Sequence, residues 1–198
     1  MFRHLIMQVL GWSGFPCNGS RQTNKEPINN LTCKRGRNNI SMVKVCSDLS
    51  KAQARGEAVT KREILLLVLE AAEESLTPVQ LQKSLFLVGR LMSKVVGDDF
   101  YHFEPYHYGP FNGTIYDDIR TEAANGFINV TTVPGQRWSC YSISNKGREE
   151  AAQVQASEKS RKNIKKIVTW VMGMTFEKLV ATIYRLYPEF KENSVFYR

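Results

Sequence analysis

The residues best suited to chemistry lie in an aromatic stretch between positions 100 and 111. It contains His102, Glu104 and His107, and two imidazoles with a carboxylate suit zinc or iron. In an extended chain, however, positions 102 and 104 share a face and position 107 lies on the other. The metalloprotease spacing H-E-x-x-H is also absent. The sequence therefore favours an aromatic stretch packed over a core, and we expect no metal site.

Other catalytic patterns are missing from the sequence. It contains no glycine-rich phosphate loop and no G-x-S-x-G motif, and no cysteine and histidine are placed as a nucleophilic pair in its main part. The carboxylate pairs Glu73-Glu74 and Asp117-Asp118 are adjacent residues, which point to different faces of a helix. We therefore expect no enzyme activity and no cofactor. The alternative is an unrecognised hydrolase.

Positive charge is concentrated at the N-terminal end of the 198-residue chain. The formal net charge is +8, but residues 1–57 hold 9 Lys/Arg and 3 Asp/Glu, whereas residues 58–198 hold 18 and 16. Residues 1–57 also lack helical or strand periodicity after Leu10. We expect a poorly ordered basic N-terminal extension over 1–57 and a nearly neutral domain over 58–198.

Cysteine and hydropathy patterns favour a cytoplasmic protein. Cys17, Cys33, Cys46 and Cys140 form no C-x-x-C pair, which indicates neither a zinc site nor a disulfide framework. The longest aliphatic run, 64–69, is far shorter than the roughly 20 residues that span a bilayer. We expect no membrane partner.

Capping signals mark the first two helices of the domain. Thr60 and Glu63 form a capping box for a helix running to about Glu74. Thr77 caps a second helix with Pro78 at its first position, and its apolar stripe continues to Gly97.

The remaining pattern predicts a winged helix. The aromatic stretch is expected to be a structured loop, because its prolines and glycine exclude a helix. A third helix is expected from 112 or 113 to 125, then a β-hairpin from strands 127–132 and 138–144. A charged helix from 145, extending with a break past 164, and a last helix ending before Pro188 should follow. The predicted fold is mainly α with a small β-hairpin, a winged helix-turn-helix followed by C-terminal helices.

Several motifs of the domain resemble the Panacea-type (SocA-like) antitoxin family. The resemblance lies in Leu81-Gln82-Lys83, in Tyr108-Gly109-Pro110 and in Tyr116 beyond it. The hairpin and the ending Tyr184-x-x-Tyr187-Pro-Glu189 look more like uncharacterised bacterial winged-helix relatives of that group. The resemblance implies a small bacterial or phage-borne protein that neutralises a toxin or takes part in phage defence, with no chemistry of its own.

These residues lead to one functional hypothesis and one alternative. The first is a non-enzymatic interaction protein that binds a protein partner, a toxin or defence effector, through Gln82, Lys83, Tyr108, Gly109, Pro110 and Tyr116. Tyr108-Gly109-Pro110 also has a structural explanation, because glycine permits a sharp turn and proline presets a helix entry. Both roles can hold together. The oligomeric state stays open.

The alternative is a winged-helix DNA-binding transcription regulator. Its third helix would enter the major groove, but it carries Asp117, Asp118 and Glu122 beside the single base Arg120. Basic residues elsewhere are more often a solvated face than a nucleic-acid site. Any binding of nucleic acid should therefore be weak. The candidate nucleic-acid-binding residues are Arg137, Lys146, Arg148, Lys162, Lys165 and Lys166.

Overall fold

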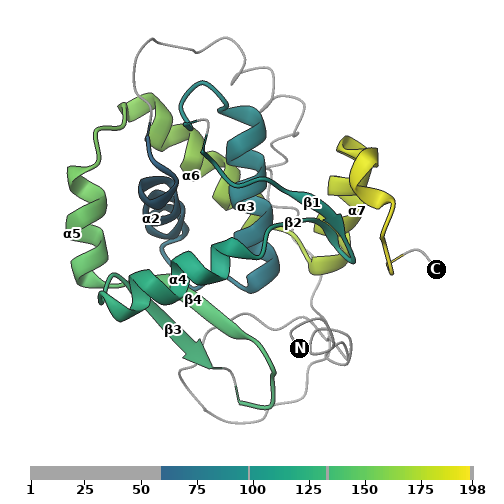
Figure 1. The fold of residues 1–198 in the computed structure, drawn as a ribbon, viewed down its shortest axis with the longest axis horizontal. Helices are drawn as coiled ribbons and strands as arrows, with labels where there is room; N and C mark the ends of the chain where they lie inside the picture. The colour runs from purple at the N-terminus through teal and green to yellow at the C-terminus, as the bar shows by residue number, and fades with distance from the viewer. Residues whose placement is uncertain (1–58, 98, 133, 197–198) are drawn as a thin grey trace, which may run out of the picture.

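The computed structural model describes residues 59–97, 99–132 and 134–196 (Figure 1). This part of the chain is mainly helical, with two antiparallel sheets of two strands each. The expected basic extension, residues 1–57, lies outside the described residues. In chain order the elements are α2 (Lys61–Ala72), α3 (Pro78–Leu91), β1 (Glu104–Tyr106), β2 (Gly109–Phe111), α4 (Thr114–Ala124), β3 (Ile128–Thr132), β4 (Ser139–Ile143), α5 (Asn145–Gln153), α6 (Glu158–Met172), α7 (Phe176–Leu186) and the short 3₁₀ helix η2 (Pro188–Lys191).

Both expected capping boxes are confirmed. The Thr60 side chain accepts a hydrogen bond from the backbone N–H of Glu63, whose carboxylate accepts from the backbone N–H of Thr60. Thr77 and Gln80 form the same reciprocal pair at the start of α3. Each box satisfies backbone donors that a helix start otherwise leaves unpaired.

The second helix ends earlier than its apolar stripe predicts. α3 stops at Leu91 instead of continuing to Gly97. The chain then turns so that Val96 forms a parallel bridge with Val59, and the Val59 N–H donates to the Val95 carbonyl at 2.8 Å. The pairing with Val59 is possible only because the helix has ended, since a helix continued to Gly97 would carry Val96 away from Val59.

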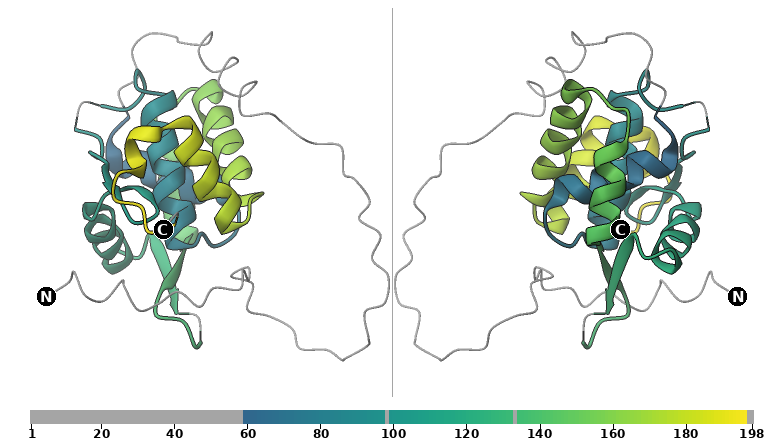
Figure 2. Two further views of the ribbon diagram at one scale, coloured as in Figure 1. Left: turned by 90° about the vertical axis from the view of Figure 1, so that its right-hand side faces the viewer. Right: turned by 90° about the vertical axis from the view of Figure 1, so that its left-hand side faces the viewer.

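α2 is the central element of the domain. Its residues 64–69 are all buried, so that no face of this stretch is left to solvent. A helix buried all round needs neighbours on every side. α2 contacts α3, α5, α6 and β4, and these elements surround it in Figures 1 and 2.

The expected loop in the aromatic stretch is instead a short β-hairpin. β1 pairs antiparallel with β2, with Pro105 opposite Pro110 and Tyr106 opposite Gly109. The two prolines do exclude a helix, as expected, but they are compatible with edge positions of a strand pair.

The second hairpin is confirmed and extends away from the helical body (Figure 2). β3 pairs antiparallel with β4 over five residues of each strand. Leu76, between α2 and α3, forms an antiparallel bridge with Tyr141 of β4. This bridge ties the base of the hairpin to the first two helices.

The C-terminal helices follow the expected order, with the expected break between α5 and α6 at residues 154–157. β4 also carries Cys140, which is buried and disulfide-bonded. One bonded cysteine is not a disulfide framework, so the expectation that the chain has none stays a prediction. The other three cysteines lie outside the described residues. In the described part of the chain, no helix is both long and apolar enough to cross a membrane.

Candidate functional site

The β1–β2 hairpin carries most of the expected partner-binding residues. Directly opposite residues in an antiparallel pair either exchange both backbone hydrogen bonds or exchange none. Pro105 and Pro110 are opposite and have no N–H to exchange, so their carbonyls point to the two outer edges of the hairpin. Each of these outward carbonyls therefore needs a donor from another part of the fold.

Lys83 of α3 supplies the donor at the β2 edge. Its Nζ donates to the Pro110 carbonyl oxygen at 2.8 Å, and its side chain is buried. Among the described residues, no carboxylate pairs with Lys83. Burial without a counter-charge disfavours the ammonium form and lowers the pKa of Lys83 to about 7.

Gln82 holds the chain just after β2. Its amide nitrogen donates to the Asn112 carbonyl at 2.8 Å, and its amide oxygen accepts from the Asn112 N–H at 3.1 Å. Burial raises the pKa of the neighbouring Tyr116 hydroxyl, against an opposing contribution from a hydrogen bond to Gln82. Gln82 therefore joins α3 both to the end of the hairpin and to α4.

Gly109 is required by its backbone conformation. Its φ of +91° lies in the left-handed region that side chains disfavour. A Cβ at this position would also contact Ile183 at 3.5 Å and Lys83 Nζ at 3.6 Å.

The C-terminal residues hold the other edge of the hairpin. The Asn193 side-chain amide donates to the outward Pro105 carbonyl at 3.2 Å. The His107 carbonyl accepts from the Tyr184 hydroxyl at 3.1 Å and from the Val195 N–H at 3.2 Å. The sequence motifs at 82–83, 105–110 and 184–195 thus meet around one hairpin.

The structure brings the six expected partner-binding residues together, but it buries four of them. Gln82, Lys83, Gly109 and Pro110 are buried, and the contacts above give them a role inside the fold. Tyr108 and Tyr116 are half-buried. A partner surface here must therefore consist mainly of neighbouring side chains.

A continuous row of aromatic rings provides such neighbours. His107 stacks on Tyr106 with centroids 4.2 Å apart, and Tyr106 stacks on Phe111 at 4.8 Å. Phe111 then lies 6.1 Å from Tyr116, which lies 6.3 Å from Tyr141. We call these five side chains the aromatic row; all but the buried Tyr141 are half-exposed.

The sequence indicates only part of the aromatic row. The members at 106–111 lie in the aromatic stretch and Tyr116 in the motif that carries the family resemblance, but Tyr141 is on a strand 25 positions beyond Tyr116. Tertiary contacts bring it to the others, among them the Leu76–Tyr141 bridge and the packing of its ring near Tyr116. The sequence carries no local signal for that contact.

The third helix, α4, is less acidic on its surface than its sequence suggests. Glu122 is buried, and its two carboxylate oxygens share the single N–H of Arg62 Nε, each at 3.0 Å. Asp118 accepts from the Tyr101 hydroxyl at 2.8 Å and lies 3.6 Å from Lys61. The third acid, Asp117, forms an ion pair with Arg120. Bases of α2 and α4 therefore neutralise these acids.

The expected nucleic-acid-binding residues fall into separate places. Lys162 and Lys165 line a hollow of about 240 Å³ between α2 and α6. Lys146 and Arg148, at the start of α5, line a neighbouring hollow of about 670 Å³. Both hollows include Glu73, so they adjoin at the end of α2. Lys166 is exposed on α6, and Arg137 lies in the turn of the β3–β4 hairpin, where it lines neither hollow.

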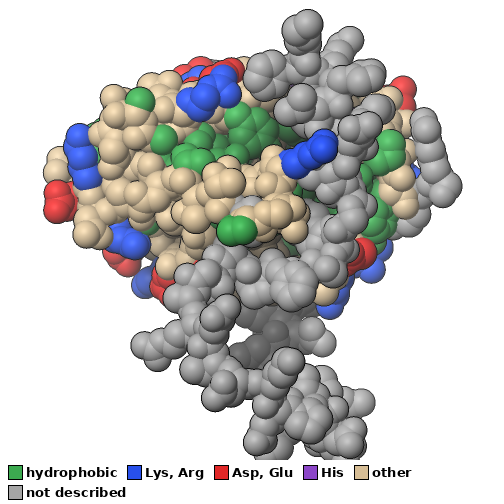
Figure 3. Space-filling model, turned by 90° about the horizontal axis from the view of Figure 1, so that it is seen from below, with side chains coloured by type: hydrophobic (Ala, Val, Ile, Leu, Met, Phe, Trp, Pro, Cys, Tyr) green, Lys and Arg blue, Asp and Glu red, His purple; other side chains and the backbone are tan. Residues whose placement is uncertain are grey.

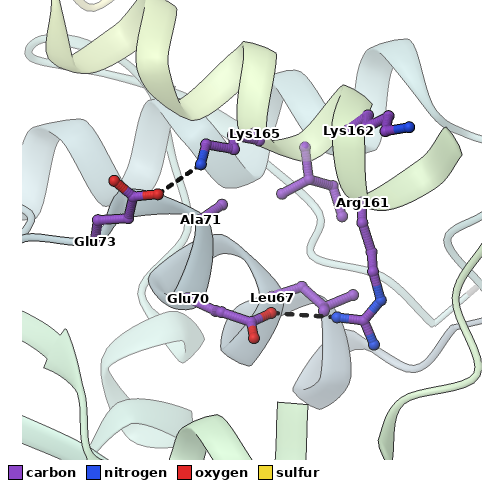
Figure 4. A pocket seen from close by; sticks show the side chains of 8 residues that line it. Leu67, Glu70, Ala71, Glu73, Arg161, Lys162 and Lys165 are labelled. Carbon is purple, nitrogen blue, oxygen red and sulfur yellow. Dashed lines mark hydrogen bonds and ion pairs between the residues drawn. The ribbon is translucent and has the colours of Figure 1, made fainter. Parts of the chain in front are cut away.

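Acidic partners reduce the charge of the smaller hollow (Figure 4). Arg161 contacts Glu70 at 3.2 Å, and Lys165 contacts Glu73 at 2.5 Å. Lys162 points away from these two pairs in the close view and lies 3.9 Å from Glu158. The hollow is thus lined by ion pairs more than by free positive charge.

The candidate metal ligands are not gathered into a site. His102 and Glu104 are exposed, and the ring of His107 stacks on Tyr106. Within the described residues, no group of three or more His, Cys, Asp or Glu is placed to hold a metal ion.

Comparison with known proteins identifies no relative of this chain. No protein-family model matches the chain, and a search of curated proteins finds no significant match.

Proposed function

We propose that the protein is a non-enzymatic winged-helix interaction protein, antitoxin-like or associated with phage defence, that binds a protein partner through the aromatic row. The observation that carries this proposal is the contact between five aromatic side chains from the β1–β2 hairpin, α4 and β4. Tyrosine and phenylalanine offer large contact areas at a small cost in side-chain entropy, which suits them to protein interfaces.

The arrangement of α2, α3, α4 and the β3–β4 hairpin supports a winged-helix fold. A winged helix has three helices followed by a hairpin, and the order here is the same once the β1–β2 hairpin is treated as an insertion between α3 and α4. The bridge between Leu76 and Tyr141 supports this interpretation, since it adds a short third strand to the hairpin between the first two helices.

A combined change of Tyr106→Ala and His107→Ala is expected to abolish partner binding. Both side chains lie at the exposed end of the aromatic row, and the backbone carbonyl of His107, which anchors the hairpin, is kept. We expect a fall in melting temperature of no more than about 4 °C, as for surface changes in a small domain. Binding is measured by co-expression with the product of the adjacent gene, using rescue of growth and co-purification.

His102→Ala is the matched control, because His102 is an exposed side chain of the same stretch outside the row. It should keep rescue and co-purification at the level of the unchanged protein. Equal rescue by the control and the double variant would contradict a partner surface on the aromatic row.

The second candidate function is a DNA-binding regulator, favoured by the exposed basic residues around the end of α2 and by the wing. The visible part of the face that carries the β3–β4 hairpin offers little support for DNA binding. In Figure 3, hydrophobic patches on this face lie among uncharged side chains, and most charged side chains lie at its margin. The exposed charges of α4, Asp117 and Arg120, pair with each other.

Binding of duplex DNA is therefore expected to be weak, tolerant of sequence and steeply dependent on salt. Phosphate contacts by a few lysines release counterions, so affinity should fall by about one to two orders of magnitude over a fourfold rise in salt. Fluorescence anisotropy at about 50 and about 200 mM salt measures this slope. The double variant with Lys162→Gln and Lys166→Gln should show a smaller salt slope. Arg137→Gln should leave the salt slope unchanged. Sequence-specific nanomolar binding that survives the higher salt would favour the regulator instead.

A further inference from the structure

β3 is a strand edge without the usual protection against pairing. Strand edges in natural proteins are commonly blocked by lysine, proline or a bulge. The sequence of β3, Ile-Asn-Val-Thr-Thr, has no charge and no proline, and it pairs with β4 without a bulge. All of its residues after Ile128 are exposed, and Val130, 48% exposed, is the only exposed large hydrophobic side chain among the described residues.

The outward backbone groups of β3 follow from the bonds of β4. Tyr141 exchanges both of its backbone hydrogen bonds with Leu76, at 2.8 and 2.9 Å. The N–H and carbonyl of Tyr141 therefore point away from β3. Val130 lies directly opposite Tyr141, and these two residues exchange no backbone hydrogen bonds. The N–H and carbonyl of Val130 thus point to the open edge. Because the pattern alternates with a period of two residues, the N–H and carbonyl groups of Ile128 and Thr132 also point to the open edge.

The β1–β2 hairpin of the same chain shows the contrasting solution. At its outward positions it has Pro105 and Pro110, which present no N–H. Their carbonyls are satisfied by Asn193 and Lys83. In the described part of the chain, the outward groups of Val130 have no such partner. The open edge of β3 therefore offers backbone N–H and carbonyl groups at every second residue, which is the pattern that pairs with an added strand.

We propose that β3 pairs antiparallel with β3 of a second copy of this chain, about a two-fold axis at Val130. Val130 would exchange both hydrogen bonds with its own copy, and Ile128 with Thr132 of the second copy. Asn129 would lie opposite Thr131. The hairpins of the two copies would then form one four-stranded sheet.

Side-chain chemistry favours a second copy as the occupant of this edge. A two-fold axis at Val130 places this residue opposite its own copy, so a charge at position 130 would meet a like charge. β3 has none. Val130 also lies on the face of the sheet that carries Tyr141, because directly opposite residues share a face. Pairing would bury two Val130 side chains beside the ends of two aromatic rows.

The pairing should be weak and should stop at two copies. A strand of five residues spans only about 17 Å, which buries less surface than a permanent dimer needs. Both copies use the same edge, so the assembly closes on itself.

Val130→Pro tests this edge directly in the full chain. The N–H that proline removes points outward, so the change costs no hydrogen bond between β3 and β4. Val130→Thr keeps the N–H and the β-branched shape, and serves as the matched control. In sedimentation over a concentration series, the unchanged protein and Val130→Thr should form a dimer at the same concentrations. Val130→Pro should stay monomeric to at least about tenfold higher concentration.

A charge pair gives a second test that does not rely on proline. Val130→Lys places two lysines together at the axis, whereas Asn129→Lys places each opposite a threonine. Only Val130→Lys should remove the dimer, and added salt should partly restore it, because salt screens like charges.

Amide hydrogen exchange in the unchanged protein separates the outcomes. Amides of Ile128, Val130 and Thr132 should exchange more slowly as concentration rises, whereas those of Asn129 and Thr131 should not change. A protein that stays monomeric up to about 1 mM, with rapid exchange at Val130, overturns the proposal. Slow exchange at Val130 in the monomer at every concentration also overturns it, because another part of the same chain would then cover the edge.

Discussion

In the unchanged protein the free energy of unfolding is expected to rise with pH above about 7, and Lys83→Met is expected to remove most of that rise. Burial holds the pKa of Lys83 at about 7, against 10.5 for an ordinary lysine. Between these values the unfolded chain binds a proton at this site and the folded chain does not. The free energy of unfolding must then increase with pH, by about 1.4 kcal/mol per pH unit for one proton.

The measurement is denaturant unfolding between pH 7 and about 9.5, below the range where tyrosines titrate. Burial raises the pKa of Tyr101, Tyr108, Tyr116 and Tyr141, so these groups lower stability only at higher pH. The unchanged protein should gain stability across the window, and Lys83→Met should gain much less. Below pH 7 the lysine is protonated in both states, and its full burial penalty applies.

Lys162→Met is the matched control for this pH dependence. Lys162 is an exposed lysine of α6 with one distant acidic neighbour, 3.9 Å away. This variant should keep the pH slope of the unchanged protein. An equal slope in Lys83→Met would mean that water or a counter-charge reaches the buried amine.

Local signals in the sequence account for the helices of the fold. The capping boxes at Thr60 and Thr77 predict the starts of α2 and α3, because the groups involved are at most three residues apart. The end of α3 could not be predicted in the same way. It depends on the bridge between Val59 and Val96, residues 37 positions apart in the chain. Helix ends set by tertiary pairing leave no local pattern.

The candidate site was predicted only in part for the same physical reason. Gln82 and Lys83 lie on α3 and Pro110 on β2, and nothing in their spacing indicates that a lysine is buried against a proline carbonyl. A lysine in an apolar helix is ordinarily assigned to the exposed face. The need for it arises from the paired prolines, which turn both of their carbonyls outward. That pairing exists only once the hairpin has formed.

Tyr116→Ala is expected to produce one of the largest losses of stability among changes in the aromatic row. The ring lies between Phe111 and Tyr141, and its hydroxyl is buried near Gln82. Truncation of a buried aromatic side chain costs about 3–5 kcal/mol, and we expect the lower end because this ring is partly exposed. Tyr116→Phe keeps the ring and loses only the hydroxyl, so it should cost about 1 kcal/mol. Denaturant unfolding of the two variants measures the difference.

Partner binding by the same two variants distinguishes packing from recognition. The Tyr116 ring links the hairpin end of the row to β4, so its loss should let Phe111 and Tyr141 move apart. We therefore expect Tyr116→Ala to bind the partner more weakly even after correction for its unfolded fraction, and Tyr116→Phe to bind almost as well as the unchanged protein. If folded Tyr116→Ala binds with full affinity, the row beyond Phe111 only supports the fold. The partner surface would then be confined to the hairpin end, at Tyr106 and His107.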